Sequence, residues 1–569
     1  MKRQQTYIKS AASDLFAWIH SPDSVDSLRN YAVVICAPLG WEYIHSHRTI
    51  RHLADRLASQ GIPTVRFDFH GTGDSPGVDL DSDRLETWKK DIHAAVNFAR
   101  ESTGCRKICL VGLRFGATLA ALASRENEIE SLVLWNPVVN GKRYLRELMA
   151  IAATSDVKKS SDTSFTETAG FLMSQETSEQ IRKINLLEET IHAKDGVLVI
   201  QRDDFETDPA LQKKLSEAQI ETDLVSLPGY LEMMAEPQFT QIPEAALTAI
   251  TEWLLSRSST LGSKFTPTLK SEIQLATEKK EIREKHFHFG SENQLSGILS
   301  SPLDPDSKKP VIVLLNSGSV HRVGPNRLYV SLARKLTAQG YPVFRMDFQG
   351  LGDSAWPTSL RENHPYPDSA VHDTESALDF LKDKLGYQHS ILIGLCSGAH
   401  SAFHAGVELT DHQILDSVLI NPLTYQWVEG MSLATNHFQE VAYYKHTMKD
   451  KSKWVKLFKG QINFSYAAQV GMTQLKNLSG KFLKSGRNSP LSKNLRKLFE
   501  QGRPLTLIIA EQDPGYDILL DSAADVAKKA IQSEKIRIHW IKDADHTFTS
   551  LEPRNELINR VCEHLKRFS

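Results

Sequence analysis

The chain has little cysteine, no long apolar run and almost no net charge, and each lack excludes a class of protein. Its five cysteines are scattered, without a C-x-x-C pair or a Cys/His cluster at metal-binding spacing. This excludes a disulfide-rich secreted scaffold or a zinc module. No stretch approaches the roughly 18 consecutive apolar residues of a membrane span. The formal net charge of −2 gives no general attraction to nucleic acid or to a membrane surface.

What remains is the composition of an ordinary globular protein, with 41% hydrophobic and 24% charged residues. The first residues, Met1 to Tyr7, are not followed by the apolar core of a signal peptide. Together with the cysteine pattern, this predicts a cytoplasmic protein without disulfides, structural metal or cofactor. The length of 569 residues is ample for two domains of similar size.

The main organising feature is an internal repeat of a strand, a helix and a second strand. The first copy has strand patterns at 31–40 and 63–68 around a helical pattern at 52–61. The second copy has strand patterns at 310–318 and 342–347 around a helical pattern at 328–339. Asp68 and Asp347 end the matching strands and are 279 positions apart, and Gly71-Thr-Gly-Asp-Ser75 and Gly350-Leu-Gly-Asp-Ser354 follow them. Such self-similarity predicts a duplicated domain.

Strands that alternate with helices of ten or more residues predict βαβ units and a mainly parallel sheet. We therefore predict two tandem α/β-hydrolase domains, each with a mainly parallel sheet flanked by helices and with a cap insertion. The predicted boundaries are 1–256 for the first domain, with a cap near 141–190, and 257–282 for a linker. The second domain is predicted at 283–569, with a cap near 424–502.

Both copies carry the strand–turn–helix pattern of a nucleophile elbow, G-x-Nu-x-G. The first copy reads Gly112-Leu-Arg-Phe-Gly116 and the second reads Gly394-Leu-Cys-Ser-Gly398. The central residue is thus Arg114 in one copy and Cys396 in the other. A cysteine can attack an acyl carbon and an arginine cannot. The pattern predicts that only the second copy retains nucleophilic chemistry.

The second copy also has an acid and a base in the order and places that this fold requires. Asp513 follows the strand pattern 505–510, and His546 follows the strand pattern 536–541. We predict Cys396 as nucleophile, His546 as general base and then acid, and Asp513 as the group that orients the imidazole. A packed, inert thiol is the alternative for Cys396. Ser397 competes as nucleophile, but only Cys396 has glycine at both positions that an elbow keeps small.

The oxyanion donors are expected beside the elbow and after the first core strand. The backbone N–H of Ser397 is the expected first donor, and Ser319 or Gly318 is expected to supply the second. His321 or Arg322 could contact substrate, with helix capping or surface ion pairs as alternatives of equal weight.

The first copy lacks more than its nucleophile. The loop at 227–235, where a histidine should lie, has none, and only Asp203 and Asp204 remain at the acid position. Arg114 could bind a carboxylate or a phosphate, or it could form an internal salt bridge with one of these aspartates. His70 is interpreted as a structural histidine.

With these motifs in view, the chain resembles the α/β-hydrolase superfamily in both halves. Both halves are similar to the serine-aminopeptidase and esterase-like hydrolases of exosortase and exopolysaccharide gene clusters. The first half resembles the branch with a Gly-Leu-Arg-x-Gly elbow. The second resembles relatives with Gly-Pro-Asn-Arg-Leu-Tyr, here 324–329, and Gly-Leu-Cys-Ser-Gly-Ala, here 394–399. Its Cys-Asp-His set is similar to that of dienelactone hydrolase.

Three functions remain open from the sequence. The first is a cysteine-dependent hydrolase of an ester, thioester or lactone, with the first domain as a pseudo-enzyme partner. The second is an acyltransferase with the same chemistry, and the third is a non-catalytic binding or scaffold protein. The segment 441–503 is rich in lysine and arginine, so an anionic or carrier-bound substrate, such as one on an acyl-carrier protein or coenzyme A, is an option. No motif supports nucleic-acid binding, and the oligomeric state is left open.

Overall fold

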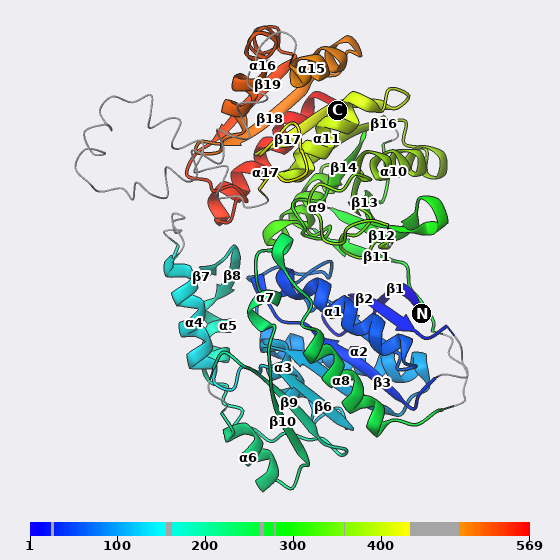
Figure 1. The fold of residues 1–569 in the computed structure, drawn as a ribbon, viewed down its shortest axis with the longest axis vertical. Helices are drawn as coiled ribbons and strands as arrows, with labels where there is room; N and C mark the ends of the chain where they lie inside the picture. The colour runs from blue at the N-terminus through cyan, green and yellow to red at the C-terminus, as the bar shows by residue number, and fades with distance from the viewer. Residues whose placement is uncertain are drawn as a thin grey trace, which may run out of the picture.

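The structure, a computed structural model, describes residues 1–23, 28–154, 162–205, 208–261, 267–277, 280–306, 308–357, 359–432 and 489–568. It consists of two α/β domains, one above the other in Figure 1, with the N-terminus in the lower domain and the C-terminus in the upper one. Each domain is built on one large sheet with helices on both faces.

The first sheet has the strand order β1-β2-β4-β3-β5-β6-β9-β10. Pairing is antiparallel only at the β1–β2–β4 edge and parallel across the rest. Its strands are β1 (Lys2–Ile8), β2 (Leu15–Ser21), β3 (Tyr31–Cys36), β4 (Thr64–Phe67), β5 (Lys107–Leu113), β6 (Ser131–Trp135), β9 (Val197–Arg202) and β10 (Thr222–Leu227). The helices α2 (Arg84–Thr103) and α3 (Phe115–Ala123) cover one face, and α1 (Trp41–Ser59) and α8 (Glu244–Arg257) cover the other.

The second sheet repeats this plan, with the order β11-β12-β13-β15-β14-β16-β17-β18-β19. Its strands are β11 (Glu272–Ala276), β12 (Glu281–Phe289), β13 (Leu295–Pro302), β14 (Val311–Leu315), β15 (Val343–Asp347), β16 (His389–Leu395), β17 (Gln413–Ile420), β18 (Leu505–Ala510) and β19 (Ile536–Ile541). The helices α10 (Ala370–Leu385), α11 (Ser397–Glu408), α15 (Pro490–Glu500) and α16 (Gly515–Gln532) pack on one face. The helices α9 (Leu328–Thr337) and α17 (Leu551–Leu565) pack on the other.

The predicted fold class is confirmed, because both sheets are mainly parallel and buried between helices. The central strands form for the reason that the sequence suggests. Strand β3 and strand β14 are apolar, and each of their residues is buried, as expected for a parallel strand covered on both faces. The predicted start of the second domain is too late. Strand β11 begins at Glu272, inside the predicted linker 257–282, and pairs antiparallel with β12.

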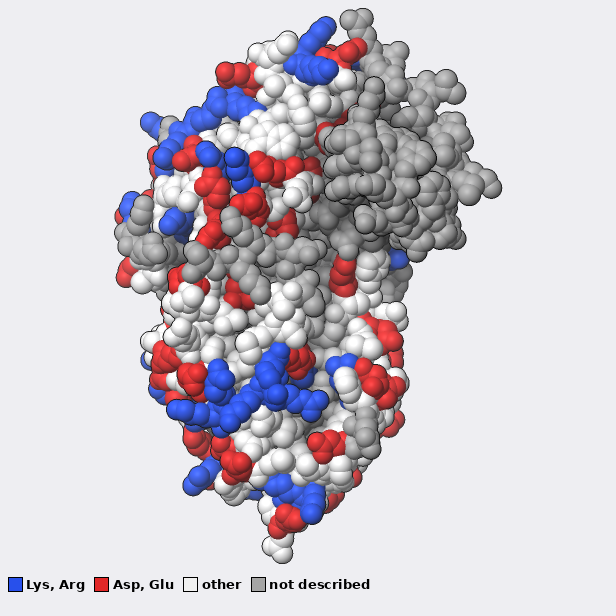
Figure 2. Space-filling view, turned by 90° about the vertical axis from the view of Figure 1, so that its left-hand side faces the viewer, with Lys and Arg blue, Asp and Glu red and all other residues white. Residues whose placement is uncertain are grey.

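An insertion between β6 and β9 occupies the place of the predicted first cap. It contains α4 (Gly141–Thr154), the hairpin β7 (Phe165–Thr168) and β8 (Phe171–Ser174), and α5 (Gln175–Arg182). Figure 2 looks onto this side of the molecule and shows lysines and arginines gathered on the first domain. Exposed basic residues of α4, α5 and the residue after α5 are Lys142, Arg143, Arg146, Arg182 and Lys183. Of the predicted second cap, 433–488 lies outside the described residues, and most of the basic segment lies there as well.

The two domains meet through the antiparallel edges of their sheets. An apolar cluster joins aromatic residues of the first domain to aliphatic residues of β11, β12 and β13. In Figure 1 these three strands face β1 and β2 of the first domain. Its members are Tyr7, Phe16, Trp18, Ile273, Leu275, Ile282 and Ile298, all less than a tenth exposed. Burial of this cluster makes the junction part of the folded core.

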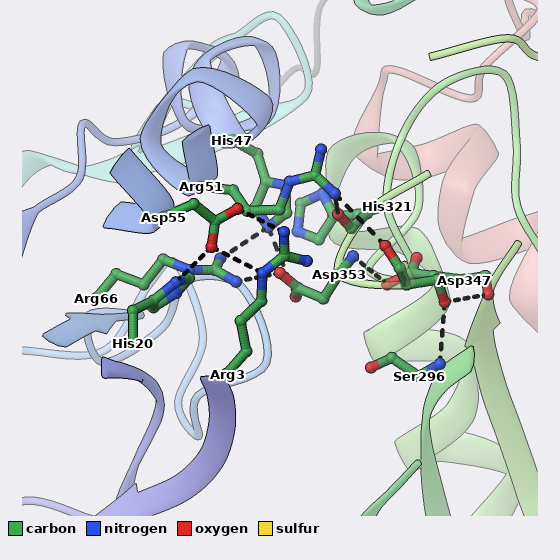
Figure 3. A network of polar contacts seen from close by, with 12 residues as sticks. Arg3, His20, His47, Arg51, Asp55, Arg66, Ser296, His321, Asp347 and Asp353 are labelled. Atoms are coloured by element: carbon green, nitrogen blue, oxygen red, sulfur yellow. Dashed lines mark hydrogen bonds and ion pairs between the residues drawn. The ribbon is translucent and has the colours of Figure 1, made fainter. Parts of the chain in front are cut away.

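A network of buried charges crosses the same junction, and Figure 3 shows the part of it around Arg66 and Asp353. The ion pairs of the network are reciprocal between the repeats. Arg66 of β4 forms an ion pair with Asp353 of the second domain, and the matching Arg345 of β15 forms one with Asp74 of the first. Arg322 lies at the centre, with its guanidinium 2.8 Å from carboxylate oxygens of Asp74, Asp347 and Asp353. The repeated Gly-x-Gly-Asp-Ser turns therefore supply the aspartates that hold the two copies together.

The network also contains a histidine whose protonation is linked to stability. The Nδ1–H of buried His20 donates to Asp55 at 2.8 Å, and its Nε2 accepts from the Nε–H of Arg66 at 2.9 Å. Burial lowers the pKa of His20 to about 4, because Arg66 adds to the cost of a charged ring and Asp55 offsets only part of it. The unfolded chain then binds a proton below about pH 6.5 that the folded chain does not.

We therefore expect His20→Gln to make stability less sensitive to acid. In the native protein, His20 removes about 2 kcal/mol of unfolding free energy as the pH falls from 7.5 to 5, toward its folded pKa of about 4. Glutamine keeps a donor and an acceptor but takes up no proton. Urea unfolding at the two pH values should show a smaller loss in the variant, and an equal loss would rule out His20 as the titrating group.

Candidate active site

The elbow holds Cys396 in a strained backbone conformation between strand β16 and helix α11. Its φ of 59° and ψ of −118° lie outside the regions that L-residues ordinarily adopt. A Cβ on Gly394 would lie 2.0 Å from the backbone of Gly398, and a Cβ on Gly398 would lie 2.6 Å from the carbonyl oxygen of Asn316. The turn is thus tight enough to require both glycines, and it leaves the Cys396 side chain only half-buried.

The other two residues of the predicted set lie together at the ends of β18 and β19. The Nδ1 of His546 is 2.6 Å from Oδ2 of Asp513, and both side chains are buried. The second oxygen of Asp513 accepts the N–H of Gly515 at 3.1 Å. This pairing places the proton of the neutral imidazole on Nδ1 and directs Nε2 away from the acid.

The electrostatics of His546 bring Cys396 into the same group. Burial by itself would lower the pKa of the imidazole, but the negative charges of Cys396 and Asp513 raise it well above its usual range. A hydrogen-bond interaction with Cys396 also contributes to the raised pKa of the ring, and Nε2 is buried with no other partner among the described residues. The histidine is thus able to exchange a proton at the nitrogen that does not face Asp513.

Two further side chains position this group, and the motif search did not identify their roles. Asn421, at the end of β17, donates from its amide to the carbonyl oxygen of His546 at 2.8 Å and accepts the N–H of Ala510 at 2.8 Å. The hydroxyl of Tyr329 accepts the N–H of Leu395, the residue before the nucleophile, at 3.0 Å. Asn421 follows the strand after the elbow, and Tyr329 is the last residue of the motif 324–329. These positions in the sequence are the signals that could have indicated their positioning roles.

Tyr366 is a third neighbour that spacing alone does not reveal. Its ring stacks on Trp427 with centroids 4.3 Å apart, and it lines the same cavity as Cys396. Burial and the charge of Cys396 raise the pKa of the phenol, so it stays a neutral hydrogen-bond donor.

The predicted oxyanion residues lie around the elbow, and some of their donor groups already make hydrogen bonds within the protein. The N–H of Ser397 is the first of helix α11 and so has no acceptor within the helix. The N–H of Gly318 donates to Oγ of Ser397 at 2.9 Å, and the Ser319 hydroxyl donates to the carbonyl oxygen of Asn363 at 2.9 Å. Gly318 and Ser319 both line the cavity next to Cys396.

Arg114 has the same backbone conformation as Cys396, with φ 54° and ψ −121°, but its side chain is held internally. Its Nε donates to Glu42 and its second terminal nitrogen to Glu147, both at 2.6 Å. The predicted partners were wrong, because Asp204 pairs with Arg202 instead. Burial would lower the pKa of Arg114, but the two glutamates and Tyr230 raise it well above its usual range.

The first domain retains a trace of the arrangement in the second. Asn136 follows β6 as Asn421 follows β17, and both have positive φ, at 47° and 43°. The amide nitrogen of Asn136 is buried without a hydrogen-bond partner, whereas that of Asn421 holds the His546 loop. The other histidine of interest, His70, contacts Ser13 and Asp81 at 3.0 Å, as expected of a structural residue.

Two residues suggested as substrate contacts lie in the domain junction instead. Arg322 is 1% exposed and is surrounded by the three aspartates of the network, so it is neither in the Cys396 cavity nor in a surface ion pair. His321 stacks on His47 of the first domain with centroids 3.9 Å apart. Burial lowers the pKa of His321 to about 4.

A cavity of about 410 Å³ opens beside the nucleophile and lies between the two domains. Cys396, His546, Tyr366 and Leu423 line it from the second domain. No cluster of three or more metal-ligating side chains occurs in the described ranges. Nor is any helix there long and apolar enough to cross a bilayer.

The fold defines an enzyme of the α/β-hydrolase type. More particularly, the chain belongs to the family described as serine aminopeptidase, S33, whose model matches residues 33–192 and 311–553. No curated protein matches the chain in sequence.

Among solved structures, the chain is similar to XC6422 from Xanthomonas campestris, described as an a/b serine hydrolase without a lid. The identity is 19%, over 45% of this chain and 95% of that one, with a TM-score of 0.31. Est1E from Butyrivibrio proteoclasticus, solved with ferulic acid, is 19% identical over 44% of this chain and 98% of its own, with a TM-score of 0.34. The esterase from Pyrobaculum calidifontis is 15% identical over 45% of this chain and 86% of its own, with a TM-score of 0.31.

Proposed function

We propose that the protein is a cysteine-dependent acyl hydrolase and that its second domain carries the reaction. The observation that carries this proposal is the combination of a cysteine on a strained elbow with a buried His546–Asp513 pair whose imidazole interacts with that cysteine. The family is named for a serine nucleophile, and this chain has a thiol at the elbow instead. A thiol needs less activation than a hydroxyl to attack an acyl carbon.

In the proposed reaction, Nε2 of His546 takes the thiol proton of Cys396, and Sγ attacks the carbonyl carbon of an ester, thioester or lactone. The bond to the leaving oxygen or sulfur breaks, and His546 donates its Nε2 proton to that atom. Nε2 of His546 then takes a proton from a water molecule as that water attacks the acyl-cysteine carbonyl. The C–S bond breaks, His546 returns the proton to Sγ, and the acid leaves with the thiol restored. The N–H of Ser397, with that of Gly318 or Ser319, would stabilise the oxyanion in both steps.

Acyl transfer to an alcohol or amine is the alternative, since it differs only in the acceptor of the second step. A carrier-bound substrate fits this alternative, and the exposed basic residues of α4 and α5 form a surface that an acidic carrier could use. Assays with p-nitrophenyl esters and acyl-coenzyme A, each with and without added alcohol or amine, distinguish the two. Acid as the sole product supports hydrolysis, and a new ester or amide in place of acid contradicts it.

The first domain is proposed to be catalytically inactive, and Arg114→Ser tests this. We expect less than a twofold gain in ester hydrolysis when the change is made in a Cys396→Ala background. The serine would have no histidine, because the loop 227–235 has none, and Glu42 would lose its ion-pair partner. Initial rates with p-nitrophenyl acetate provide the measurement, and restoration of even a hundredth of the native rate would show that the first site is functional.

A further inference from the structure

We propose that the first domain, which lacks a triad of its own, forms the acyl-binding wall of the Cys396 site and selects substrates with a neutral, apolar acyl group. This inference rests on the proposed function. The observation behind it is that the cavity beside the nucleophile is lined from both domains. The first domain contributes the apolar and aromatic residues Trp41, Ile44, His45, Ala169, Phe171 and Pro237, together with Glu236 and Gln238.

The hairpin β7–β8 delivers part of this wall and is anchored on the second domain. The carboxylate of Glu167 accepts the N–H of Leu551 at 2.8 Å, at the start of the helix that follows the His546 loop. The carbonyl oxygen of Gly170 accepts from Arg554 at 2.7 Å. Figure 1 shows the hairpin directly below α17. These anchors hold the hairpin turn where Ala169 and Phe171 line the cavity.

The hairpin tip fits the second domain closely. Gly170 has a φ of +82°, and a Cβ there would lie 2.3 Å from the side chain of Asn326. Asn326 itself lines the cavity, and its amide is 3.4 Å from the carbonyl oxygen of Thr547, the residue after His546. A glycine at this position lets the cap of one domain reach the histidine loop of the other.

The rest of the wall is fixed in the same way. The amide of Asn363, in the second domain, donates to the carbonyl oxygen of Pro237 at 2.7 Å. The Nδ1 of His45 is 3.0 Å from the carbonyl oxygen of Met234, and burial lowers the pKa of its ring. Trp41 packs edge-on against this ring with centroids 5.1 Å apart. The first domain thus presents apolar and neutral aromatic groups in fixed positions.

The chemistry of the lining indicates what the wall accepts. Apart from histidine, the charged groups among the described lining residues are the carboxylates Glu236 and Asp545. Asp545 accepts from the N–H of Thr549 at 2.6 Å, and Glu236 from the amide of Gln238 at 2.7 Å. Two carboxylates disfavour an anionic acyl group, and the apolar side chains favour a hydrocarbon or aromatic one.

Phe171→Ala tests this wall without depending on turnover. Cys396 is alkylated with iodoacetamide and with N-benzyl iodoacetamide, and the ratio of the two rate constants is measured in the full chain. We expect the ratio of the benzyl rate constant to the iodoacetamide rate constant to be higher for Cys396 in the native protein than for free cysteine. Phe171→Ala should lower this ratio about fivefold. Phe205→Ala is the matched control, because Phe205 is 60% exposed and lies on the first domain away from the cavity.

The same variants are then compared in kcat/KM for p-nitrophenyl benzoate relative to p-nitrophenyl acetate. A fivefold fall in both ratios for Phe171→Ala, with none for Phe205→Ala, supports the wall. Unchanged ratios in both assays overturn it, even if the esters are hydrolysed. If the alkylation ratio changes but no ester or thioester is hydrolysed, the result supports the acyl-binding wall and contradicts the proposed hydrolase function. Ile44→Ala, from helix α1, provides a second variant should Phe171→Ala fold poorly.

Discussion

Cys396→Ala is expected to lower kcat/KM for p-nitrophenyl esters by about 10⁴-fold while leaving the fold intact. The thiol is the proposed nucleophile, and an alanine side chain fits the elbow without touching Gly394 or Gly398. His546→Ala should cost a similar factor, because the imidazole is the proposed base and acid. At pH 7 it should also slow alkylation of Cys396 by at least about tenfold, since a neighbouring imidazolium favours the thiolate.

Cys105→Ala is the matched control for the nucleophile. Cys105 is buried in the first domain, where its Sγ contacts the carbonyl oxygen of Arg29, so it has no access to the cavity. We expect its loss to change hydrolysis by less than twofold. If Cys396→Ala keeps a tenth or more of the native activity, another group forms the acyl-enzyme and the proposed mechanism is wrong.

Arg322→Ala is expected to destabilise the protein by about 3–5 kcal/mol, the largest effect on stability that we predict. The guanidinium is 1% exposed and lies 2.8 Å from three aspartates. Without it, three buried carboxylates repel one another at the junction of the domains. Because the Cys396 cavity is lined from both domains, hydrolysis should fall together with stability.

Arg361→Ala is the control for this prediction. Arg361 is 67% exposed and lies 3.6 Å from Glu429, and a surface ion pair contributes at most about 1 kcal/mol. Arg322→Lys should recover part of the loss, because it keeps the charge but not the forked geometry. Urea unfolding measures all three variants. A loss below 1 kcal/mol for Arg322→Ala would show that the network does not hold the domains together.

The sequence is sufficient to predict the two sheets and the elements of the candidate site. Strands β18 and β19 have the predicted bounds, because β18 is a short apolar run and β19 alternates apolar with polar residues, and polar turns flank both. The glycines around Cys396 and Arg114 identify both elbows, since the geometry of that turn restricts the residue types. Asp513 and His546 follow from strand ends, which meet at one edge of a parallel sheet.

The junction between the domains could not be predicted in this way. Arg322, Asp74 and Asp353 carry the signature of ordinary polar turns, and only packing of one copy on the other brings them together. The partners of Arg114 come from α1 and α4, at sequence separations of 72 and 33, and no periodicity links them to the elbow. The hairpin that lines the cavity has strands of only four residues each, so its position depends on contacts with α17.

The location of the acyl group during turnover tests the central claim most directly. The protein is mixed with excess p-nitrophenyl ester, quenched in acid within milliseconds to seconds, digested, and the modified peptide is identified by mass spectrometry. The account predicts a thioester on Cys396 that hydroxylamine removes and that is absent from Cys396→Ala. An acyl group on Ser397 or on another residue, or turnover without any acylation of Cys396, would contradict it.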